Sequence, residues 1–258
     1  MPTMPVVFFG HGSPMNALET NPTTEAWAKL GVGLPRPRAI LAVSAHWFIP
    51  GTKVTAAEQP RTIHDFGGFP RALYEMSYRA PGAPWLADRV AALLAPAPVA
   101  RDTSWGLDHG TWSVLVHAFP AADVPVVQLS IDETQPPAFH YELGRKLAPL
   151  RDEGVLLIGS GNVVHNLEAL AWGRHEPRPY DWADRFETIV RGALETGDDA
   201  ALVDYGRHGG DALLAVPTPE HYLPLLYVLG ARRIDDAVRF PVSGVQLGSI
   251  SMLTAVLG

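Results

Sequence analysis

Four short runs of consecutive apolar residues stand out along the chain, and each contains several β-branched or bulky side chains. They cover Pro5–Phe9, Ala39–Ala45, Val124–Ile131 and Val155–Gly159. Continuous apolar runs are typical of strands covered on both faces, whereas alternating runs are typical of strands with one face in water. The pattern therefore predicts four buried strands.

Apolar residues recur at helical spacing in five further segments. The predicted helices are Trp85–Leu94, Thr111–Phe119, Pro137–Leu150, Trp182–Leu194 and Pro219–Leu229, the last beginning with a proline suited to a first helical turn. Residues 237–257 predict two further strands around a turn at 243–244. Strands that alternate with helices favour an α/β fold in which helices cover both faces of a largely parallel central sheet.

The polar stretches Gly173–Tyr180 and Gly197–Gly210 predict surface loops, and neither has the composition of a domain linker. The chain shows no internal repeat and no low-complexity segment. Its 258 residues are 47% hydrophobic, which is enough for a full core. We therefore expect residues 1–258 to form a single domain.

Composition and charge exclude several classes of function. The chain has no cysteine, which excludes disulfides, thiolate zinc sites, iron–sulfur clusters and cysteine nucleophiles. Its net charge of −7 disfavours nucleic acid as a partner. It lacks a signal-like segment and any apolar run of about 18 residues, so we expect a cytoplasmic protein without a membrane span. A monomer and a small homo-oligomer both remain open.

Three of the ten histidines follow predicted strands. His11 and His46 come directly after the first two, and His165 follows the last one by a short turn. In open α/β sheets, ligands bind outside the carboxyl ends of the strands. Small residues such as Gly10, Gly12 and Ser44 flank these histidines and permit close approach of a ligand. The placement indicates a candidate metal site.

Other histidines divide into candidates and structural residues. His221 lies at the predicted start of a helix beside Glu220, and His109 lies in a loop that leads into a helix. Both stay candidates, whereas we interpret His64 as a structural loop residue. The remaining four are interpreted as structural as well: His117, His140, His175 and His208.

Ligand chemistry limits which metal would fit. Neutral imidazoles suit zinc, iron, copper and nickel, and three protein ligands leave open positions that a catalytic site needs. Spacing alone does not separate iron(II) from zinc. It also leaves open a zinc hydrolase that uses metal-bound hydroxide, and a non-enzymatic metal-binding protein on the same fold.

Six motifs occur in an order that is highly specific when taken together, although any one alone would be weak. They are Gly10-His11-Gly12-Ser13-Pro14-Met15, Ser44-Ala45-His46-Trp47, Ile63-His64-Asp65-Phe66-Gly67-Gly68-Phe69-Pro70, Trp105-Gly106-Leu107-Asp108-His109-Gly110, Gly159-Ser160-Gly161-Asn162-Val163-Val164-His165-Asn166 and Pro217-Thr218-Pro219-Glu220-His221-Tyr222. From about residue 5 to its end, the chain closely resembles the class III extradiol ring-cleavage dioxygenases of the 4,5-DOPA dioxygenase group.

The resemblance implies a single catalytic α/β domain with a non-haem Fe(II) centre that zinc is able to occupy. It implies His11, His46 and His221 as metal ligands, with His165 as a fourth ligand or an acid–base group. More distant class III enzymes use two histidines and a glutamate, so Glu220 is the alternative to His221 as the third ligand.

The activity implied is cleavage of a catechol such as L-DOPA by dioxygen, giving a semialdehyde acid. As a hypothesis, His165 protonates the departing oxygen, and His109 binds or polarises dioxygen or the substrate oxygen. Five aromatic residues near the motifs are candidates for the pocket wall, each of which also suits plain core packing: Trp47, Phe66, Phe69, Trp112 and Tyr222. The physiological catechol and the regiochemistry stay open.

Overall fold

An eight-stranded sheet with the order β4-β3-β5-β2-β6-β1-β10-β7 runs through the computed structural model, which describes residues 3–171 and 178–258. Its strands are β1 (Val6–Gly10), β2 (Ala39–Ile49), β3 (Thr52–Thr55), β4 (Val99–Asp102), β5 (Val126–Asp132), β6 (Val155–Gly161), β7 (Val238–Val242) and β10 (Thr254–Leu257). The pairs β1–β6, β2–β5, β2–β6 and β3–β4 are parallel, and the other three pairs are antiparallel. The four predicted strands thus form the parallel centre of the sheet.

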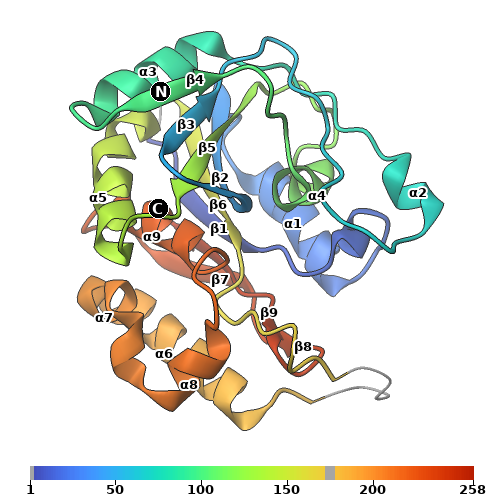
Figure 1. Ribbon diagram of the computed structural model, residues 1–258, viewed down its shortest axis with the longest axis vertical. Coiled ribbons are helices and arrows are strands. Elements are labelled where there is room, and N and C mark those ends of the chain that lie inside the picture. The colour runs from blue at the N-terminus through green and yellow to red at the C-terminus, as the bar shows by residue number, and fades with distance from the viewer. Residues whose placement is uncertain (1–2, 172–177) are drawn as a thin grey trace.

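Helices cover both faces of this sheet, as predicted (Figure 1). They are α1 (Pro22–Gly33), α2 (Arg71–Tyr74), α3 (Pro84–Leu94), α4 (His109–Ala118), α5 (Pro137–Leu147), α6 (Asp181–Thr196), α7 (Asp199–Val203), α8 (Gly210–Ala215) and α9 (Leu223–Gly230), with 3₁₀ turns η1 (Pro14–Ala17), η2 (Ala148–Arg151) and η3 (Tyr205–His208). Along β1, Val6 and Phe8 join the core beneath α5 and α9, whereas Val7 and Phe9 join the core beneath α1 and α4. Burial on both faces explains why the runs are continuously apolar.

Strand β2 is longer than the predicted run and includes His46, which we expected just beyond its end. Its pairing with β5 shifts register between Val43 and Phe48. Such an irregularity bends a strand and re-aims its side chains. His46 therefore lies in the distorted part of β2, at the same end of the sheet as His11.

The predicted helix Pro219–Leu229 begins later than expected, at Leu223. The carbonyl of Pro219 accepts hydrogen bonds from the amides of Tyr222 and Leu223, at 2.9 and 3.0 Å, and closes a turn before the helix. Pro224 occupies the first helical turn instead, where its missing N–H has no cost. His221 accordingly belongs to a turn, as does Glu220.

The segment Gly197–Gly210 is not a plain loop, because it contains α7 and η3. The Asp198 side chain accepts a hydrogen bond from the Ala201 amide at 3.0 Å, and Ala201 and Leu202 are buried. The N-cap hydrogen bond and the burial of these two apolar side chains stabilise a short helix inside a polar stretch. In the other predicted loop, Gly173–Tyr180, residues 173–177 lie outside the described residues.

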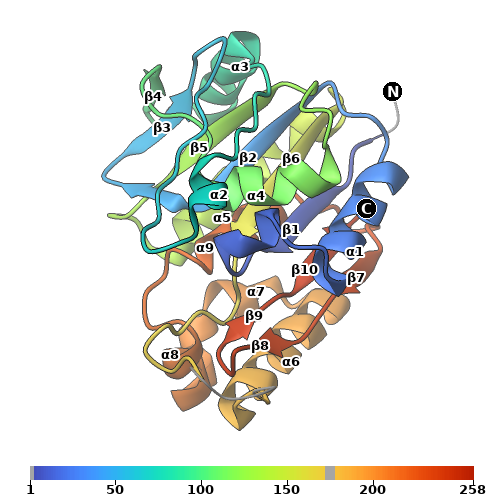
Figure 2. The same ribbon diagram turned by 90° about the vertical axis from the view of Figure 1, so that its right-hand side faces the viewer.

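The end of the chain contains a hairpin that the pattern did not predict. The Glu187 carboxylate accepts the Gly244 amide at 2.6 Å and the Ser251 hydroxyl at 2.7 Å. These contacts hold a hairpin of β8 (Val245–Gln246) and β9 (Ile250–Ser251) below the main sheet, beside α6 (Figure 2). None of the helices in the described ranges is both long and apolar enough to cross a bilayer.

Candidate metal centre

The carboxyl end of β6 ties together the two loops that carry His11 and His221. The carbonyl of Gly161 accepts the His11 amide at 3.1 Å, and the carbonyl of His221 accepts the Asn162 amide at 2.8 Å. A Cβ added to Gly161 would lie 2.1 Å from that His221 carbonyl oxygen. Glycine at position 161 is therefore what lets the His221 turn approach the sheet.

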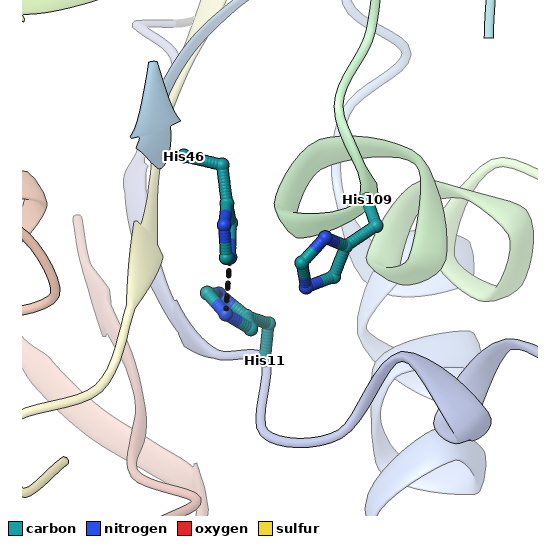
Figure 3. A group of neighbouring side chains, drawn as sticks. All are labelled: His11, His46 and His109. Carbon is teal, nitrogen blue, oxygen red and sulfur yellow. Dashed lines mark hydrogen bonds between the residues drawn. The ribbon is translucent and has the colours of Figure 1, made fainter. Parts of the chain in front are cut away.

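His11, His46 and His109 converge on one space from three elements: the end of β1, the distorted part of β2 and the first turn of α4 (Figure 3). The Nε2 atoms of His11 and His46 are 3.1 Å apart. The ring centroids of His46 and His109 are 3.8 Å apart, and those of His11 and His109 are 5.7 Å apart. The structure thus brings together His11 and His46, which were predicted from strand ends, and His109, which was a candidate in a loop that leads into a helix.

In three of the rings, those of His11, His221 and His46, the Nδ1 atom faces a hydrogen-bond acceptor. Nδ1 of His11 is 3.0 Å from the Ser160 hydroxyl, which donates its own proton to the Gly110 carbonyl and so accepts from the ring. Nδ1 of His221 is 3.1 Å from a Glu220 oxygen. Nδ1 of His46 is 3.3 Å from an Asp65 oxygen. These contacts favour the proton on Nδ1 and leave the Nε2 lone pairs free.

Asp65 holds His109 by two contacts. Its Oδ1 accepts the His109 backbone N–H at 2.8 Å, and its Oδ2 accepts Nδ1–H at 2.9 Å. The same Oδ2 is the atom near His46, so one carboxylate orients two rings of the cluster. These contacts hold the pKa of Asp65 below its usual value even though burial opposes this.

His165 completes the cluster by stacking. Its ring is nearly parallel to that of His221, at 8°, with centroids 3.5 Å apart. Its backbone amide donates to the Ala215 carbonyl at 2.8 Å, which fixes the loop after β6. All five candidate histidines of the sequence therefore lie in one cluster.

Burial dominates the electrostatics of the cluster. It lowers the pKa of His46 to about 3 and that of His165 to about 4. It also lowers the pKa of His11 and of His221 well below the usual value, and neighbouring imidazoles add to the effect. Burial disfavours the charged form of a histidine. These four rings are therefore neutral at pH 7, the form that binds a metal ion.

Two groups of side chains each present ligand atoms within 4.8 Å of one another: His11, His46 and His109, and His165, Glu220 and His221. The groups adjoin, because the His221 centroid is 5.4 Å from that of His11 and 5.2 Å from that of His46. Buried neutral imidazoles whose free lone pairs face one another at close range suit a cation. The donor set fits a bound metal.

Four of the five histidines interpreted as structural lie within the described residues, and each contacts a group outside the cluster. His64 contacts the Met76 carbonyl at 3.0 Å and His117 the Asn16 carbonyl at 2.7 Å. Nδ1 of His140 is 3.0 Å from the Tyr227 hydroxyl. His208 contacts the Ala201 carbonyl at 3.1 Å, and His175 is outside the described residues.

A cavity of about 600 Å³ opens beside the cluster. It is lined by the five histidines and by Gly12, Ser13, Pro14, Met15, Phe66, Phe69, Leu167, Leu170, Gln246, Leu247 and Ile250. Two of the five predicted pocket aromatics, Phe66 and Phe69, are among them. The other three take part in packing: Trp47 stacks on Trp105, Trp112 donates to the Ile63 carbonyl, and Tyr222 donates to the Leu202 carbonyl.

Sequence reasoning assigned no role to Ser160 or Asp65, and it treated Glu220 only as an alternative ligand. Ser160 and Glu220 accept from Nδ1 of His11 and His221, respectively. An oxygen of Asp65 lies near Nδ1 of His46. One signal was present for Asp65, a carboxylate within a motif that also carries two phenylalanines of the pocket. Ser160 gave no such signal, because in the sequence it is one of several small residues at the end of a predicted strand.

Comparison with known proteins agrees with this geometry. The family model described as catalytic LigB subunit of aromatic ring-opening dioxygenase matches residues 7–257. A protein of Escherichia coli K12 named 4,5-DOPA dioxygenase extradiol is 55% identical over 99% of this chain and 95% of its own length. A Beta vulgaris protein with the same name is 39% identical over 87% of this chain and 85% of its own.

The crystal structure of an uncharacterized protein from Escherichia coli K12 superposes with a TM-score of 0.87 and 50% sequence identity. The alignment covers 99% of this chain and 100% of that one. Together these matches favour ring cleavage over the zinc hydrolase and the non-enzymatic metal-binding protein. They imply dioxygen and a small aromatic molecule as substrates. The chain belongs to the LigB family and is a class III extradiol ring-cleavage dioxygenase.

Proposed function

We propose that this enzyme opens the ring of a catechol such as L-DOPA with dioxygen at a non-haem Fe(II) centre, giving a semialdehyde acid, and that it acts in the cytoplasm. The observation that carries the proposal is the set of three histidines whose Nδ1 atoms face Ser160, Asp65 and Glu220. The relatives named 4,5-DOPA dioxygenase extradiol support the choice of substrate.

The proposed ligands are His11, His46 and His221. Metal–nitrogen bonds of about 2.1 Å put ligand nitrogens about 3.0 to 3.4 Å apart and ring centroids about 5 Å apart. The Nε2 atoms of His11 and His46 are separated by 3.1 Å. The centroids of the three rings are separated by 5.0, 5.2 and 5.4 Å. These distances support one shared ion.

Glu220 is assigned a supporting role in this proposal rather than that of a ligand. Its Oε1 accepts from Nδ1 of His221 and from the Thr218 hydroxyl, at 3.1 and 2.8 Å. A carboxylate that accepts from the outer nitrogen of a ligating histidine fixes its tautomer and raises its basicity. The negative charge that a neutral ligand set lacks is then supplied by the bound catecholate.

Iron(II), when bound, supplies electron transfer between the catechol ring and dioxygen; zinc has no accessible redox change and would support binding only. His109 and His165 handle protons in this proposal. Asp65 fixes the proton of His109 on Nδ1, so exchange with the substrate takes place at Nε2. His165 stacks on the His221 ring and lines the same cavity. Because burial keeps it neutral at pH 7, it would first accept a proton released by the catechol and then return that proton to the departing oxygen.

The test is anaerobic reconstitution with iron(II) and, separately, with zinc(II), followed by L-DOPA or unsubstituted catechol and air. We expect oxygen uptake and a new visible absorbance with iron, and neither with zinc. Absence of oxygen uptake with iron across several catechols would overturn the proposal. Equal activity with zinc and without oxygen would indicate hydrolysis instead.

A further inference from the structure

Part of the cavity lining is formed by leucine side chains that stay partly exposed to solvent. Leu167 and Leu247 both line the cavity, yet 58% and 38% of their surfaces stay exposed to solvent. Among the described residues, no lysine or arginine lines the cavity. Beside the histidines, a ligand in the cavity would therefore meet a mostly apolar lining in which Ser13 and Gln246 are the polar side chains.

Leu247 has an unusual backbone conformation. It lies at the tip of the β8–β9 hairpin with φ of 51°, followed by Gly248 with φ of 82°. Left-handed backbone is favourable for glycine and tolerable for asparagine, whereas a branched apolar side chain there is strained. Asparagine at position 247 would meet the same turn with less strain, so the turn itself gives no reason for leucine.

Burial does not explain leucine at this position either. The hairpin tip is held through its backbone, because the Leu247 carbonyl accepts the Ala171 amide and the Gly248 carbonyl accepts the Tyr180 amide, both at 2.9 Å. Gly248 is fixed for a separate reason, since a Cβ there would lie 2.8 Å from the Tyr180 ring. The side chain of Leu247 lines the cavity and stays partly exposed to solvent. A ligand bound in the cavity would cover this exposed apolar surface.

We propose that Leu247 is a specificity-determining residue that packs against the ring substituent of the bound catechol, and that the enzyme prefers catechols with an apolar substituent to catechol itself. Strained residues that persist without a structural reason cluster at ligand contacts. The apolar neighbours Leu167, Leu170 and Ile250 extend the same wall. This inference rests on the proposed function, because it assumes that the diol lies at the metal.

The test compares 4-propylcatechol with catechol in the wild type, in Leu247→Asn and in Leu213→Asn. Leu213 is a matched control, 72% exposed on α8 and outside the cavity lining. Affinity for the zinc-loaded protein is measured by calorimetry, kcat/KM for the iron-loaded protein by oxygen uptake, and the thermal midpoint for both. We expect Leu247→Asn to reduce the preference for 4-propylcatechol about tenfold, the size of a lost apolar contact in a pocket.

The same variant should keep or raise the thermal midpoint, because asparagine tolerates the left-handed turn, and Leu213→Asn should keep the wild-type preference. An unchanged preference in Leu247→Asn would overturn the inference and leave the proposed function intact. An equal loss for both catechols with a lowered midpoint would show that Leu247 only supports the hairpin, and would also overturn it. Failure of the wild type with both of these catechols but turnover of L-DOPA would overturn the inference alone. Failure with L-DOPA as well would overturn the proposed function and the inference with it.

Discussion

The imidazole rings of His165 and His221 lie face to face, 3.5 Å apart and 8° from parallel. The lone pair of a ring nitrogen lies in the plane of its ring. An ion in the plane of His221 would therefore lie about 3.5 Å above the plane of His165, out of line with its lone pairs. At the proposed site only one of the two rings would ligate a metal, and the geometry favours His221, because its centroid lies 5.4 Å from that of His11 and 5.2 Å from that of His46.

Replacement of His165 by alanine should leave iron bound and depress turnover. A general acid–base group typically contributes about 10²–10⁴-fold to the rate. The check is metal content by elemental analysis together with kcat on the same preparation. Loss of the metal in His165→Ala would make His165 a ligand and would contradict the assignment to proton transfer.

Glu220→Gln and His221→Ala should separate a supporting residue from a ligand. We expect His221→Ala to lose the metal and the activity. Glu220→Gln should keep the metal with an affinity weaker by about 10–100-fold, the usual effect of removing a carboxylate behind a ligating histidine. Competition with a chelator measures both affinities. Metal retained by His221→Ala but lost by Glu220→Gln would identify the carboxylate as the third ligand.

Asp65→Asn should lower kcat more than it lowers metal affinity. Asparagine has one accepting oxygen, and its NH2 group only donates. It is therefore unable to accept from both the backbone N–H and Nδ1–H of His109, as the two carboxylate oxygens do at 2.8 and 2.9 Å. His109 would then lose its fixed tautomer, which we expect to cost about 10²-fold in kcat. Asp123→Asn, which alters only a surface pair with Arg36, is the control. A fall in metal affinity without a fall in the kcat of the loaded enzyme would contradict the role assigned to His109.

His140, which does not line the cavity, should make the protein less stable in mild acid. It is fully buried, and burial lowers its pKa to about 4 from an ordinary 6.5. The unfolded chain therefore binds a proton between these values that the folded chain does not, so stability falls as the pH falls from about 6.5 to 4.

His140→Asn keeps a partner for the Tyr227 hydroxyl and removes this titration. Between pH 7 and pH 5 the free energy of unfolding of the wild type should fall by about 2 kcal/mol more than that of the variant. Denaturant unfolding at the two pH values measures the difference. Parallel pH profiles for the two proteins would mean that His140 is protonated in the folded state as readily as in the unfolded chain.

Much of the cluster was predictable because strand ends are visible in a sequence. Continuous apolar runs located β1, β2 and β6, and parallel strands bring their carboxyl ends to one edge. His11 and His165 follow from this argument directly. His46 was expected beyond the end of β2 and lies within it, because the strand continues through a distortion that no apolar pattern marks.

The partners of the histidines were not predictable in the same way. Ser160 is 149 residues from His11, and Asp65 is 44 residues from His109. Such contacts depend on the relative placement of loops, which periodicity does not describe. The hairpin tip at Leu247 was missed for a related reason, since leucine is an unusual residue for a left-handed turn and the sequence pointed to the Ser243-Gly244 step instead.

Each proposed ligand has a protein group behind it: Ser160 lies on a buried core strand, and Asp65 and Glu220 are held by hydrogen bonds to neighbouring groups. These groups orient the rings but do not distinguish one divalent ion from another, because neutral imidazoles suit both iron(II) and zinc. The choice of ion at the proposed site would therefore be made by supply rather than by the protein. The active fraction of the enzyme in a cell would follow the balance of free iron and zinc.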